Sequence, residues 1–283
     1  MHGLSTRCKW EAQTTEAAIT YMRSQSLSSL FALQLRVIGA LMMRELHTRF
    51  GRHGLGFLWI IGEPILFCAG VAIVWSAIRP AHEHGLPTTA IVITGYVPLT
   101  MWRHCMGRAV LAFEANGSLL FHRQVTPLDI IVSRTTLEVM GVIGAGILVS
   151  SLAIIFGFMK PPHNIGLIYV GTLFQILFCF ATALIVAPLT QRSELFEKSI
   201  NVLSYLSLPL SGAFVMVDWI PPHYRWILLL SPSVDSIEMI RAGQFGYTAH
   251  AHYDIIYSIW INFVLILIGV SLTLRSKKYI YIN

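Results

Sequence analysis

The sequence predicts an all-α integral membrane protein with six transmembrane helices, an N-terminal amphipathic interfacial helix and outer re-entrant or half-helices before the last span, with both termini cytoplasmic. Three observations predict this fold: an apolar composition, long apolar segments, and an asymmetric distribution of lysine and arginine. Hydrophobic residues make up 55% of the 283 residues and charged residues 12%, whereas about 25% of a soluble domain is charged. Because so few charged residues cannot cover the surface of a soluble protein of this size, we expect lipid around most of the chain.

Five segments reach the roughly 20 apolar residues that one membrane crossing needs, and a sixth, Thr88–Trp102, is shorter because Arg103 interrupts it. With its flanks included, this short segment becomes the second of six expected spans. The spans are expected at about 55–78, 88–113, 136–158, 165–189, 199–217 and 254–275. Six spans place 16 of the 20 Lys and Arg residues in the cytoplasm, whereas omitting the second span divides them equally. The positive-inside rule therefore favours six spans.

The segments outside this transmembrane domain, 55–275, differ in character. Residues 1–27 form a polar extension to which we assign no function, and residues 276–283 form a cytoplasmic tail. Residues 28–53 are expected to form an amphipathic helix, because their apolar residues fall within a stripe about 120° wide. The stripe consists of Phe31, Leu35, Ile38, Met42, Leu46 and Phe50. Too polar to span, this helix should lie in the cytoplasmic interface, as a plain anchor or as a contact to a partner.

Two connecting segments are long enough to hold structure of their own. Glu114–Ser133, between the second and third spans, is the longest internal cytoplasmic loop and has room for one short helix. On the outer side, Asp218–Asp254 contains two short apolar pieces separated by Ser231-Pro232. Because each piece is too short to cross, we expect half-helices that dip into the outer leaflet or pack over the bundle. Two surface helices without a special role are the alternative.

The chain carries no motif that predicts an enzyme. It lacks a glycine-rich lysine loop for phosphates and a His-Glu-x-x-His pair, and Ser211-Gly212 lacks the preceding glycine of a serine nucleophile turn. Two histidine pairs share the predicted outer side, His82 with His84 and His250 with His252. Loop histidines are usually solvated, so we expect no metal and no catalytic residue. The net charge of +6 suits anionic lipid, so no nucleic-acid partner is expected.

One ionisable residue, Glu63, lies in the middle of the first predicted span and is followed by Pro64. A carboxylate at a helix centre costs about a few kcal/mol and usually faces a bundle interior or an aqueous path. Pro64 removes a backbone donor and should kink the helix. Two interpretations stay open: a hydrogen-bonded Glu63 that locks two helices, and one that lines a path. The other apolar runs contain no further acid or histidine, which argues against proton-coupled transport; these runs are Thr88–Trp102, Val139–Phe158, Ile165–Leu189, Ile200–Val217 and Ile255–Leu274.

Three segments carry a resemblance to a known family. They are Thr48–Trp59 with the following Glu63-Pro64, the loop Leu119–Asp129, and the outer segment Ser231–Gly243. Together they resemble type-2 ABC exporter permeases for polysaccharides, most closely the capsular polysaccharide permeases of the KpsM type. The likeness covers nearly the whole chain from about Leu30 onward, with the three motifs in the right order and on the expected sides.

The resemblance implies a homodimer of six-span subunits in the bacterial inner membrane, joined to two copies of a cytoplasmic ATP-binding subunit. ATP and Mg would bind that partner, and this chain would hold no cofactor. The cargo would be a lipid-anchored capsular polysaccharide, received by a periplasmic co-polymerase or adaptor, with membrane lipids around the spans. The sequence agrees, because it contains no nucleotide-binding loop and needs a partner for energy.

The resemblance also suggests three sets of functional residues. The polymer would pass between the first and fifth spans of the two subunits, along aromatic and polar side chains of Trp59, Glu63, Ser204, Tyr205, Ser207 and Ser211. Plain helix packing is the alternative for each of them. The ATPase would be coupled through Glu114–Asp129 and the interfacial helix, with Arg44, Arg49, Arg52, Leu119, Leu120, Phe121 and Arg123. The outer half-helices would gate the exit through Trp226, Pro232, Glu238 and Arg241.

Two other classes of function remain as alternatives. A secondary transporter would need internal repeats with paired broken helices, and the two halves of this chain do not show such pairing. A membrane-embedded transferase for lipid-linked glycan would need several His, Asp or Glu residues at one membrane face. Only the two histidine pairs qualify. A neighbouring gene for a Walker-motif ATPase would favour the permease.

The six-span topology predicts which sites a membrane-impermeant thiol reagent reaches from the periplasm. In a variant without the four native cysteines, Glu83→Cys and Lys160→Cys should be labelled, because both positions lie in predicted outer loops. Arg123→Cys should react only after the membrane is permeabilised. Labelling at Arg123→Cys in intact spheroplasts would exclude this topology.

Overall fold

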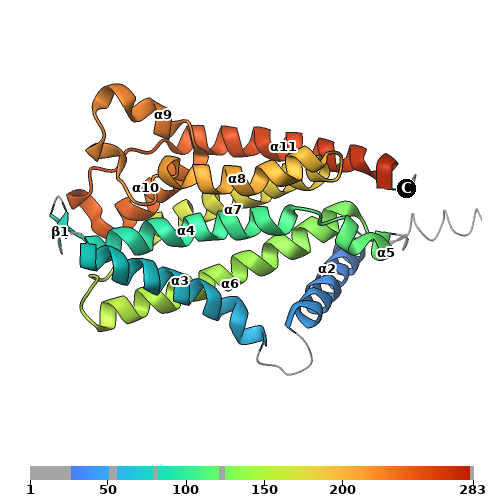
Figure 1. Ribbon diagram of the computed structural model, residues 1–283, viewed down its shortest axis with the longest axis horizontal. Helices are drawn as coiled ribbons and strands as arrows, with labels where there is room; N and C mark the ends of the chain where they lie inside the picture. The colour runs from blue at the N-terminus through green and yellow to red at the C-terminus, as the bar shows by residue number, and fades with distance from the viewer. Residues whose placement is uncertain (1–26, 51–55, 79–81, 84, 121–124, 281–283) are drawn as a thin grey trace, which may run out of the picture.

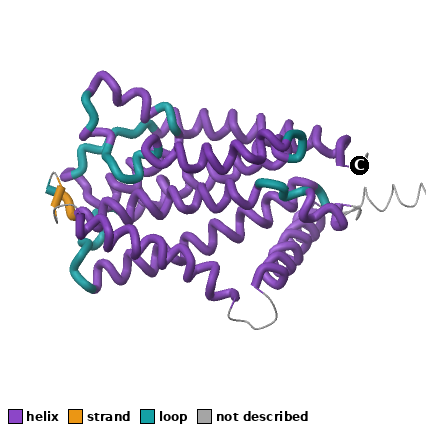
Figure 2. Tube along the Cα trace, in the orientation of Figure 1, coloured by secondary structure: helices purple, strands orange, loops and turns teal. Residues whose placement is uncertain are grey.

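The computed structural model describes residues 27–50, 56–78, 82–83, 85–120 and 125–280. Within this part six long helices run side by side, and almost everything else is helix or short loop (Figures 1 and 2). The six are α3 (Gly56–Ile78), α4 (Thr88–Ala109), α6 (Pro127–Ile155), α7 (Ile165–Thr190), α8 (Glu194–Leu210) and α11 (Ile255–Ile280). Helix α2 (Leu27–Phe50) crosses the bundle obliquely at one end (Figure 1).

The two ends of the bundle carry different short elements. Helix α2, the short helix α5 (Gly117–Leu120) and the end of α11 lie together at one end (Figure 1). The opposite end holds a two-stranded antiparallel hairpin of β1 (His82–Glu83) and β2 (Leu86–Pro87), together with α9 (Arg225–Leu229). In the hairpin His82 pairs with Pro87 and Glu83 with Leu86. The elements predicted for the cytoplasmic and outer sides thus lie at opposite ends of the molecule.

Three helices in the described part are long and apolar enough to cross a membrane: α6, α7 and α11. The described apolar stretch of α3 is shorter, Ile65–Trp75. Helix α8 has only 17 residues, and α4 carries Arg103, His104 and Arg108. Length and composition therefore support three spans directly, and the remaining three depend on how these helices pack.

Helix α6, which contains most of the third predicted span, starts at Pro127, nine residues before the predicted span begins at about 136. Thr126 and Asp129 form a capping box: the Asp129 amide donates to Thr126 Oγ1 at 3.3 Å, and the Thr126 amide donates to Asp129 Oδ2 at 2.8 Å. Pro127 at the first helical position also favours the start of the helix, because its ring fixes φ near the helical value. The predicted loop Glu114–Ser133 is therefore shorter, and consists of η1 (Glu114–Asn116), α5 and a short link to α6.

Helix α8, which contains most of the fifth predicted span, stops at Leu210, whereas the span was expected to reach 217. Gly212 has φ +67°, a left-handed conformation that glycine adopts without strain. Irregular chain follows, then η2 (Val217–Trp219) and η3 (Pro222–Tyr224). At the C-terminus the helix is longer than the predicted span, since α11 continues to Ile280 through most of the expected tail.

Helix α10 (Pro232–Phe245) packs backbone against backbone on the central helix α7. A Cβ atom added at Gly171 of α7 would lie 2.8 Å from the Ser236 carbonyl oxygen. One added at Gly243 of α10 would lie 2.8 Å from the Asn164 carbonyl oxygen. Small residues allow such close approach between helices in membranes. Helix α10 is therefore part of the bundle core, and the alternative of two surface helices does not hold for it.

Buried side chains also connect the long helices by hydrogen bonds. Gln175 Nε2 on α7 donates to the Pro98 carbonyl oxygen of α4 at 3.0 Å. Thr273 Oγ1 on α11 donates to the Leu184 carbonyl oxygen of α7 at 2.9 Å. Helix α7 is thereby fixed between α4, α10 and α11. The remaining faces of α4 contact α3, α6 and α8.

Candidate functional site

A groove of about 210 Å³ opens between α3, α4 and α8. It is lined by Phe67, Tyr96, Thr100, Arg103, His104, Gly107, Ser204 and Tyr205. Two predicted path residues, Ser204 and Tyr205, are therefore brought opposite Phe67 of α3. The first and fifth predicted spans border one groove, and α4 forms the wall that joins them. The polymer path stays a prediction.

One face of α4 supplies most of the polar lining of this groove. Tyr96, Thr100, Arg103 and Gly107 follow the i, i+4, i+7, i+11 spacing of a single helix face. The Arg103 guanidinium carbon lies 5.2 Å from the centroid of the Tyr205 ring, which is a cation–π distance. In the sequence Arg103 contributed only to the assignment of topology by the positive-inside rule, and no pattern there indicated its position in the groove.

The other predicted path residues are distributed around α8 and α3. Ser207 and Ser211 line a second cavity of about 330 Å³ further along α8, together with Trp102 and Phe178. Trp59 is 54% exposed on the surface of α3. The backbone of Glu63 belongs to α3, and its side chain lies outside the described part of the chain. The predicted path residues thus do not form one continuous surface in a single chain.

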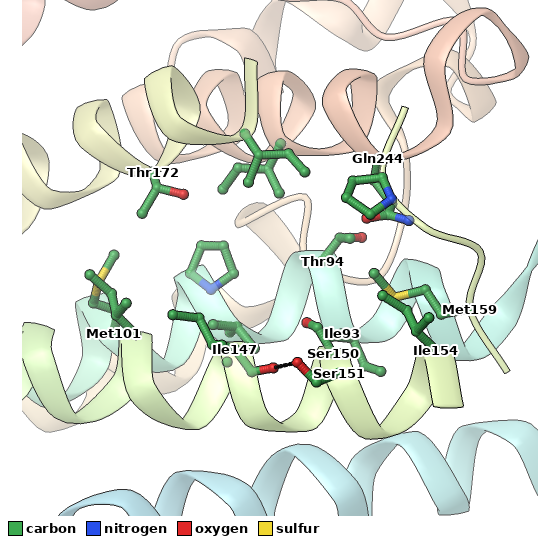
Figure 3. Close-up of a pocket in the computed structure, with 17 residues that line it drawn as sticks. Ile93, Thr94, Met101, Ile147, Ser150, Ser151, Ile154, Met159, Thr172 and Gln244 are labelled. Atoms are coloured by element: carbon green, nitrogen blue, oxygen red, sulfur yellow. Dashed lines mark hydrogen bonds between the residues drawn. The ribbon is translucent and has the colours of Figure 1, made fainter. Parts of the chain in front are cut away.

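A third cavity, of about 300 Å³, lies between α4, α6, α7 and α10 (Figure 3). Its walls are mainly apolar, with Met101 and Met159 at its ends and Ser150 and Ser151 along α6. The Ser151 hydroxyl donates to the Ile147 carbonyl oxygen at 2.7 Å and is thus already bonded. None of the predicted path, coupling or gate residues lines this cavity, and we assign it no function.

Polar contacts join α2, η1 and α6 at the end of the bundle that holds α5. We name these residues the α2–α6 cluster: Gln34, Arg44, Glu45, Asn116, Asp129 and Arg134. Arg44 Nη1 donates to Asn116 Oδ1 at 3.1 Å, and Arg134 Nη2 lies 3.2 Å from Glu45 Oε1. Gln34 Nε2 donates to Asp129 Oδ1. The interfacial helix is therefore tied both to the loop after α4 and to the first turns of α6.

A buried carboxylate on α6 holds the same end of α4. Glu138 lies 3.2 Å from Arg108 Nε and 3.3 Å from His104 Nδ1. Arg134, one turn before Glu138, donates from Nη1 to the Arg108 carbonyl oxygen at 3.1 Å. Glu138 was not singled out in the sequence because it immediately precedes the apolar run Val139–Phe158, although it lies inside the predicted span 136–158. The early start of α6, encoded by Thr126-Pro127 and Asp129, was the signal that could have placed it well inside the helix.

The predicted coupling residues divide into three groups. Arg44 belongs to the α2–α6 cluster. Leu120 is 3% exposed and packs in the apolar core with Phe113 and Ile130, and Leu119 is half-buried. The side chain of Arg49, and Arg52, Phe121 and Arg123 entirely, lie outside the described residues. The exposed positions of this loop are Glu114, Ala115 and Ser118. These positions, and not Leu120, are available for contact with another subunit.

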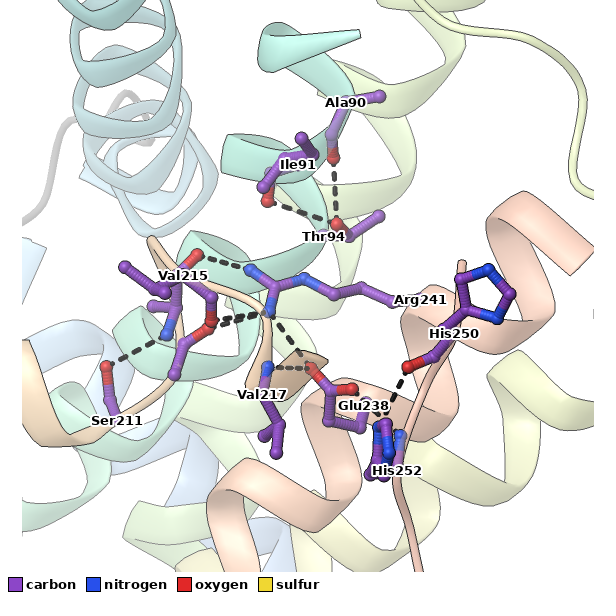
Figure 4. A network of polar contacts seen from close by, with 12 residues as sticks. Ala90, Ile91, Thr94, Ser211, Val215, Val217, Glu238, Arg241, His250 and His252 are labelled. Atoms are coloured by element: carbon purple, nitrogen blue, oxygen red, sulfur yellow. Dashed lines mark hydrogen bonds and ion pairs between the residues drawn. The ribbon is translucent and has the colours of Figure 1, made fainter. Parts of the chain in front are cut away.

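At the opposite end, fully buried Arg241 binds the irregular chain that follows α8 (Figure 4). Its guanidinium donates to the carbonyl oxygens of Gly212 at 2.7 Å, Ala213 at 2.6 Å and Val215 at 3.2 Å. Its Nη1 also lies 3.4 Å from Glu238 Oε1. In a buried environment these carbonyls would otherwise be unsatisfied, which is costly.

Glu238 completes this network by accepting two backbone amides (Figure 4). The Val217 amide donates to Oε1 at 3.3 Å, and the His252 amide donates to Oε2 at 3.1 Å. Burial raises the pKa of the Glu238 carboxyl, and the charge of Arg241 opposes this shift. The pair therefore connects the chain after α8 with the chain before α11.

The four predicted gate residues do not share one surface. Glu238 and Arg241 are buried together, whereas Trp226 on α9 is 64% exposed. Pro232 is the first residue of α10. Glu238 and Arg241 thus position the outer segment and do not line its surface, and a gate role for Trp226 stays a prediction.

The known family model that describes ABC-2 type transporters matches residues 36–245. This chain belongs to the ABC-2 type transporter family. The resemblance drawn from the three sequence segments is thereby confirmed, and the family consists of transport proteins and not of enzymes. Membership implies a separate ATP-binding partner subunit. Together with the apolar helices, it identifies the chain as a multi-pass inner-membrane protein.

Several relatives align with this ABC-2 chain over most of their length. Capsule polysaccharide export inner-membrane protein CtrC of Neisseria meningitidis serogroup B is 36% identical over 87% of this chain and 93% of the relative. Capsule polysaccharide export inner-membrane protein BexB of Haemophilus influenzae has the same identity and coverage. Polysialic acid transport protein KpsM of Escherichia coli is 27% identical over 86% of this chain and 94% of the relative.

Removal of the Arg241 side chain should destabilise the ABC-2 chain strongly. In Arg241→Met the three carbonyl groups lose their donor and Glu238 keeps a buried, unpaired charge, which we expect to cost about 3–5 kcal/mol. The apparent melting temperature of the detergent-purified protein measures this effect. As a matched control, Arg225→Met removes a partly exposed outer cation bonded to Asp218, and should lower the melting temperature much less.

Adding Glu238→Gln to Arg241→Met should not lower the melting temperature further, because the amide removes the unpaired charge. Parental stability of Arg241→Met would contradict this account of the outer segment.

Proposed function

We propose that this chain is the transmembrane subunit of an ATP-driven exporter that moves capsular polysaccharide across the bacterial inner membrane. The observation that carries the proposal is the alignment over 93% of the length of two relatives named for capsule polysaccharide export. The groove between α3, α4 and α8 supports it, because aromatic faces and hydroxyl groups suit sugar rings. Weak contacts of this kind let a polymer slide.

In this proposal α3, α4, α6, α7, α8 and α11 each cross the membrane, and both termini are cytoplasmic. The distribution of lysine and arginine supports the topology. The grouping of α2, α5 and the end of α11 at one end of the bundle also supports it (Figure 1). The charges of α4 are compatible with a span, since Arg108 and His104 contact Glu138 inside the protein and Arg103 faces the groove. Helix α9 and the beginning of α10 would enter the outer leaflet without crossing the membrane.

A second copy of the chain would complete the path. Large apolar side chains remain exposed on α3 and α8, among them Trp59, Phe67, Tyr205 and Leu206. A homodimer would cover these faces and convert the one-sided groove into a closed path. The polymer would then contact Trp59, Glu63, Ser204, Tyr205, Ser207 and Ser211. In the single chain the described members of this set are divided between the groove, the second cavity and the surface of α3.

Two copies of an ATP-binding subunit, carrying ATP and Mg, would dock on the exposed part of the loop Glu114–Ser118 and on α2. The α2–α6 cluster offers a physical route for the movement, because it connects this loop to α6 by charged contacts. Glu138 continues the route to α4. Arg49, Arg52, Phe121 and Arg123 would extend the docking surface. Such coupling needs contacts that differ between two states of the transporter.

On the outer side, α9 would form the exit gate, with Trp226 exposed and the break at Ser231-Pro232 as its hinge. Glu238 and Arg241 would hold the fixed end of this gate on α7. A periplasmic co-polymerase or adaptor would receive the lipid-anchored chain there, and membrane lipids would surround the spans.

Deletion of the gene should abolish surface polysaccharide and leave the polymer inside the cell. Restoring the parental chain should restore export, and a partner ATPase without its Walker lysine should not support it. Within the same assay, Glu63→Gln and Trp59→Ala should reduce polysaccharide per copy of assembled transporter while ATP hydrolysis continues, because they alter the path only.

Parental surface polysaccharide in the deletion strain would exclude the proposed function. If export requires the chain but both path variants work at the parental rate, only the assignment of Glu63 and Trp59 is wrong.

The docking surface is tested by cysteine crosslinking in a background without native cysteines. Ser118→Cys should crosslink to a cysteine in the ATP-binding subunit of the assembled complex, because this position is exposed. Leu120→Cys, two residues away and buried, serves as the matched control and should not react. An active complex without a crosslink at Ser118→Cys would reject this docking surface.

A further inference from the structure

Arg103 lies at an unusual depth for a charged residue. It is 15 residues after the start of α4 and six before its end, or about 22 Å and 9 Å along the axis at 1.5 Å per residue. The side chain is therefore well inside the bundle and does not lie at a helix end. Ionisable residues at such depth are costly in a membrane and usually mark a substrate pathway or pair with an opposite charge.

Arg103 has no opposite charge to pair with among the described residues. It makes neither an ion pair nor a hydrogen bond there, and its one contact of this kind is with the Tyr205 ring. Glu138 of α6 contacts Arg108 and also His104, which lines the groove beside Arg103. Arg103 thus lines the groove, and no carboxylate among the residues whose side chains the structure describes pairs with it.

The groove has space and hydrogen-bonding capacity beside this guanidinium. A Cβ atom added at Gly107, one turn further along the same face, would meet nothing within 4 Å. The buried Thr100 hydroxyl, one turn before Arg103, has no hydrogen-bond partner among the described residues. Tyr96 and Tyr205 add two aromatic rings. A guanidinium, a spare hydroxyl and aromatic faces around open space form a site for an anionic sugar.

We propose that Arg103 binds the anionic group, a carboxylate or a phosphate, of successive units of the exported polymer. The inference rests on the proposed export function and narrows its substrate to an acidic polysaccharide. The planar guanidinium matches both groups with paired hydrogen bonds. Stacking on Tyr205 holds the guanidinium in place without neutralising it. A single charged contact of this kind is weak enough to be exchanged as the chain advances.

An anionic lipid headgroup offers the same chemistry, but the position of Arg103 favours the polymer. The backbone of Arg103 lies about 9 Å along the axis from the end of α4, and its side chain lines a groove bordered by α3 and α8. A sugar chain that passes between these helices meets Arg103 directly. The experiment below therefore includes a lipid arm.

The test uses the complete complex of permease and ATP-binding subunit in nanodiscs of zwitterionic lipid. The probe is a fluorescent short oligosialic acid, compared with its carboxyl-methylated ester. The parental complex should bind the acid more tightly than the ester. Arg103→Gln should weaken binding of the acid about tenfold, as expected for the loss of one charge-assisted contact, and leave binding of the ester unchanged. Arg103→Lys should recover part of the affinity.

Two controls separate this role from general charge or packing effects. Arg275→Gln removes one exposed positive charge near the end of α11 and should bind the acid like the parent. Tyr205→Phe keeps the ring and should bind normally, whereas Tyr205→Leu should weaken binding of the acid several-fold because the guanidinium loses its support.

Equal binding of acid and ester by the parental complex would overturn the inference, as would unchanged acid binding in Arg103→Gln. Either result would leave the export function intact, since the deletion strain tests that function separately. If Arg103→Gln instead loses binding of added phosphatidylglycerol and keeps the oligosialic acid, the site belongs to lipid and the inference is wrong.

Discussion

The outer half of this permease depends on one buried guanidinium. Helix α8 ends before its apolar segment does, and the chain that follows exposes carbonyl groups within the bundle. Non-helical backbone at this depth requires internal partners. Arg241 supplies them for Gly212, Ala213 and Val215, and Glu238 supplies acceptors for two amides on either side. Because α10 is also packed on the backbone of α7, the end of α8 is fixed relative to the centre of the molecule.

Helix α4 connects this fixed part to the end of the bundle that holds α5. Its residues serve different purposes: Arg103 lines the groove, His104 and Arg108 contact Glu138, and another face packs on α7. A movement of α6 that displaced Glu138 would therefore act on the same turns of α4 that present Arg103. The α2–α6 cluster is the point at which such a movement would begin. Coupling and substrate contact thus share one helix.

The two sides of the groove differ in how firmly they are held. Helix α4 has hydrogen bonds or ion pairs to α6 and α7, whereas many large apolar side chains of α3 and α8 face outward. A fixed α4 and exposed apolar side chains on α3 and α8 are consistent with a path formed between two copies of the chain. The anionic site lies on the fixed wall, where its position changes least.

The sequence by itself determined where helices can form, because apolar length and local capping are properties of neighbouring residues. It contained the break between α9 and α10 at Ser231-Pro232, and it also held the capping box that starts α6, although that signal was overlooked. The family resemblance followed from short contiguous motifs for the same reason. Only the tertiary structure decided that Arg241 reaches carbonyls 26 to 29 residues away, that Glu138 contacts α4, and that Leu120 faces the core. These contacts depend on which helix faces lie side by side, and residues distant in sequence carry no local signal of that arrangement.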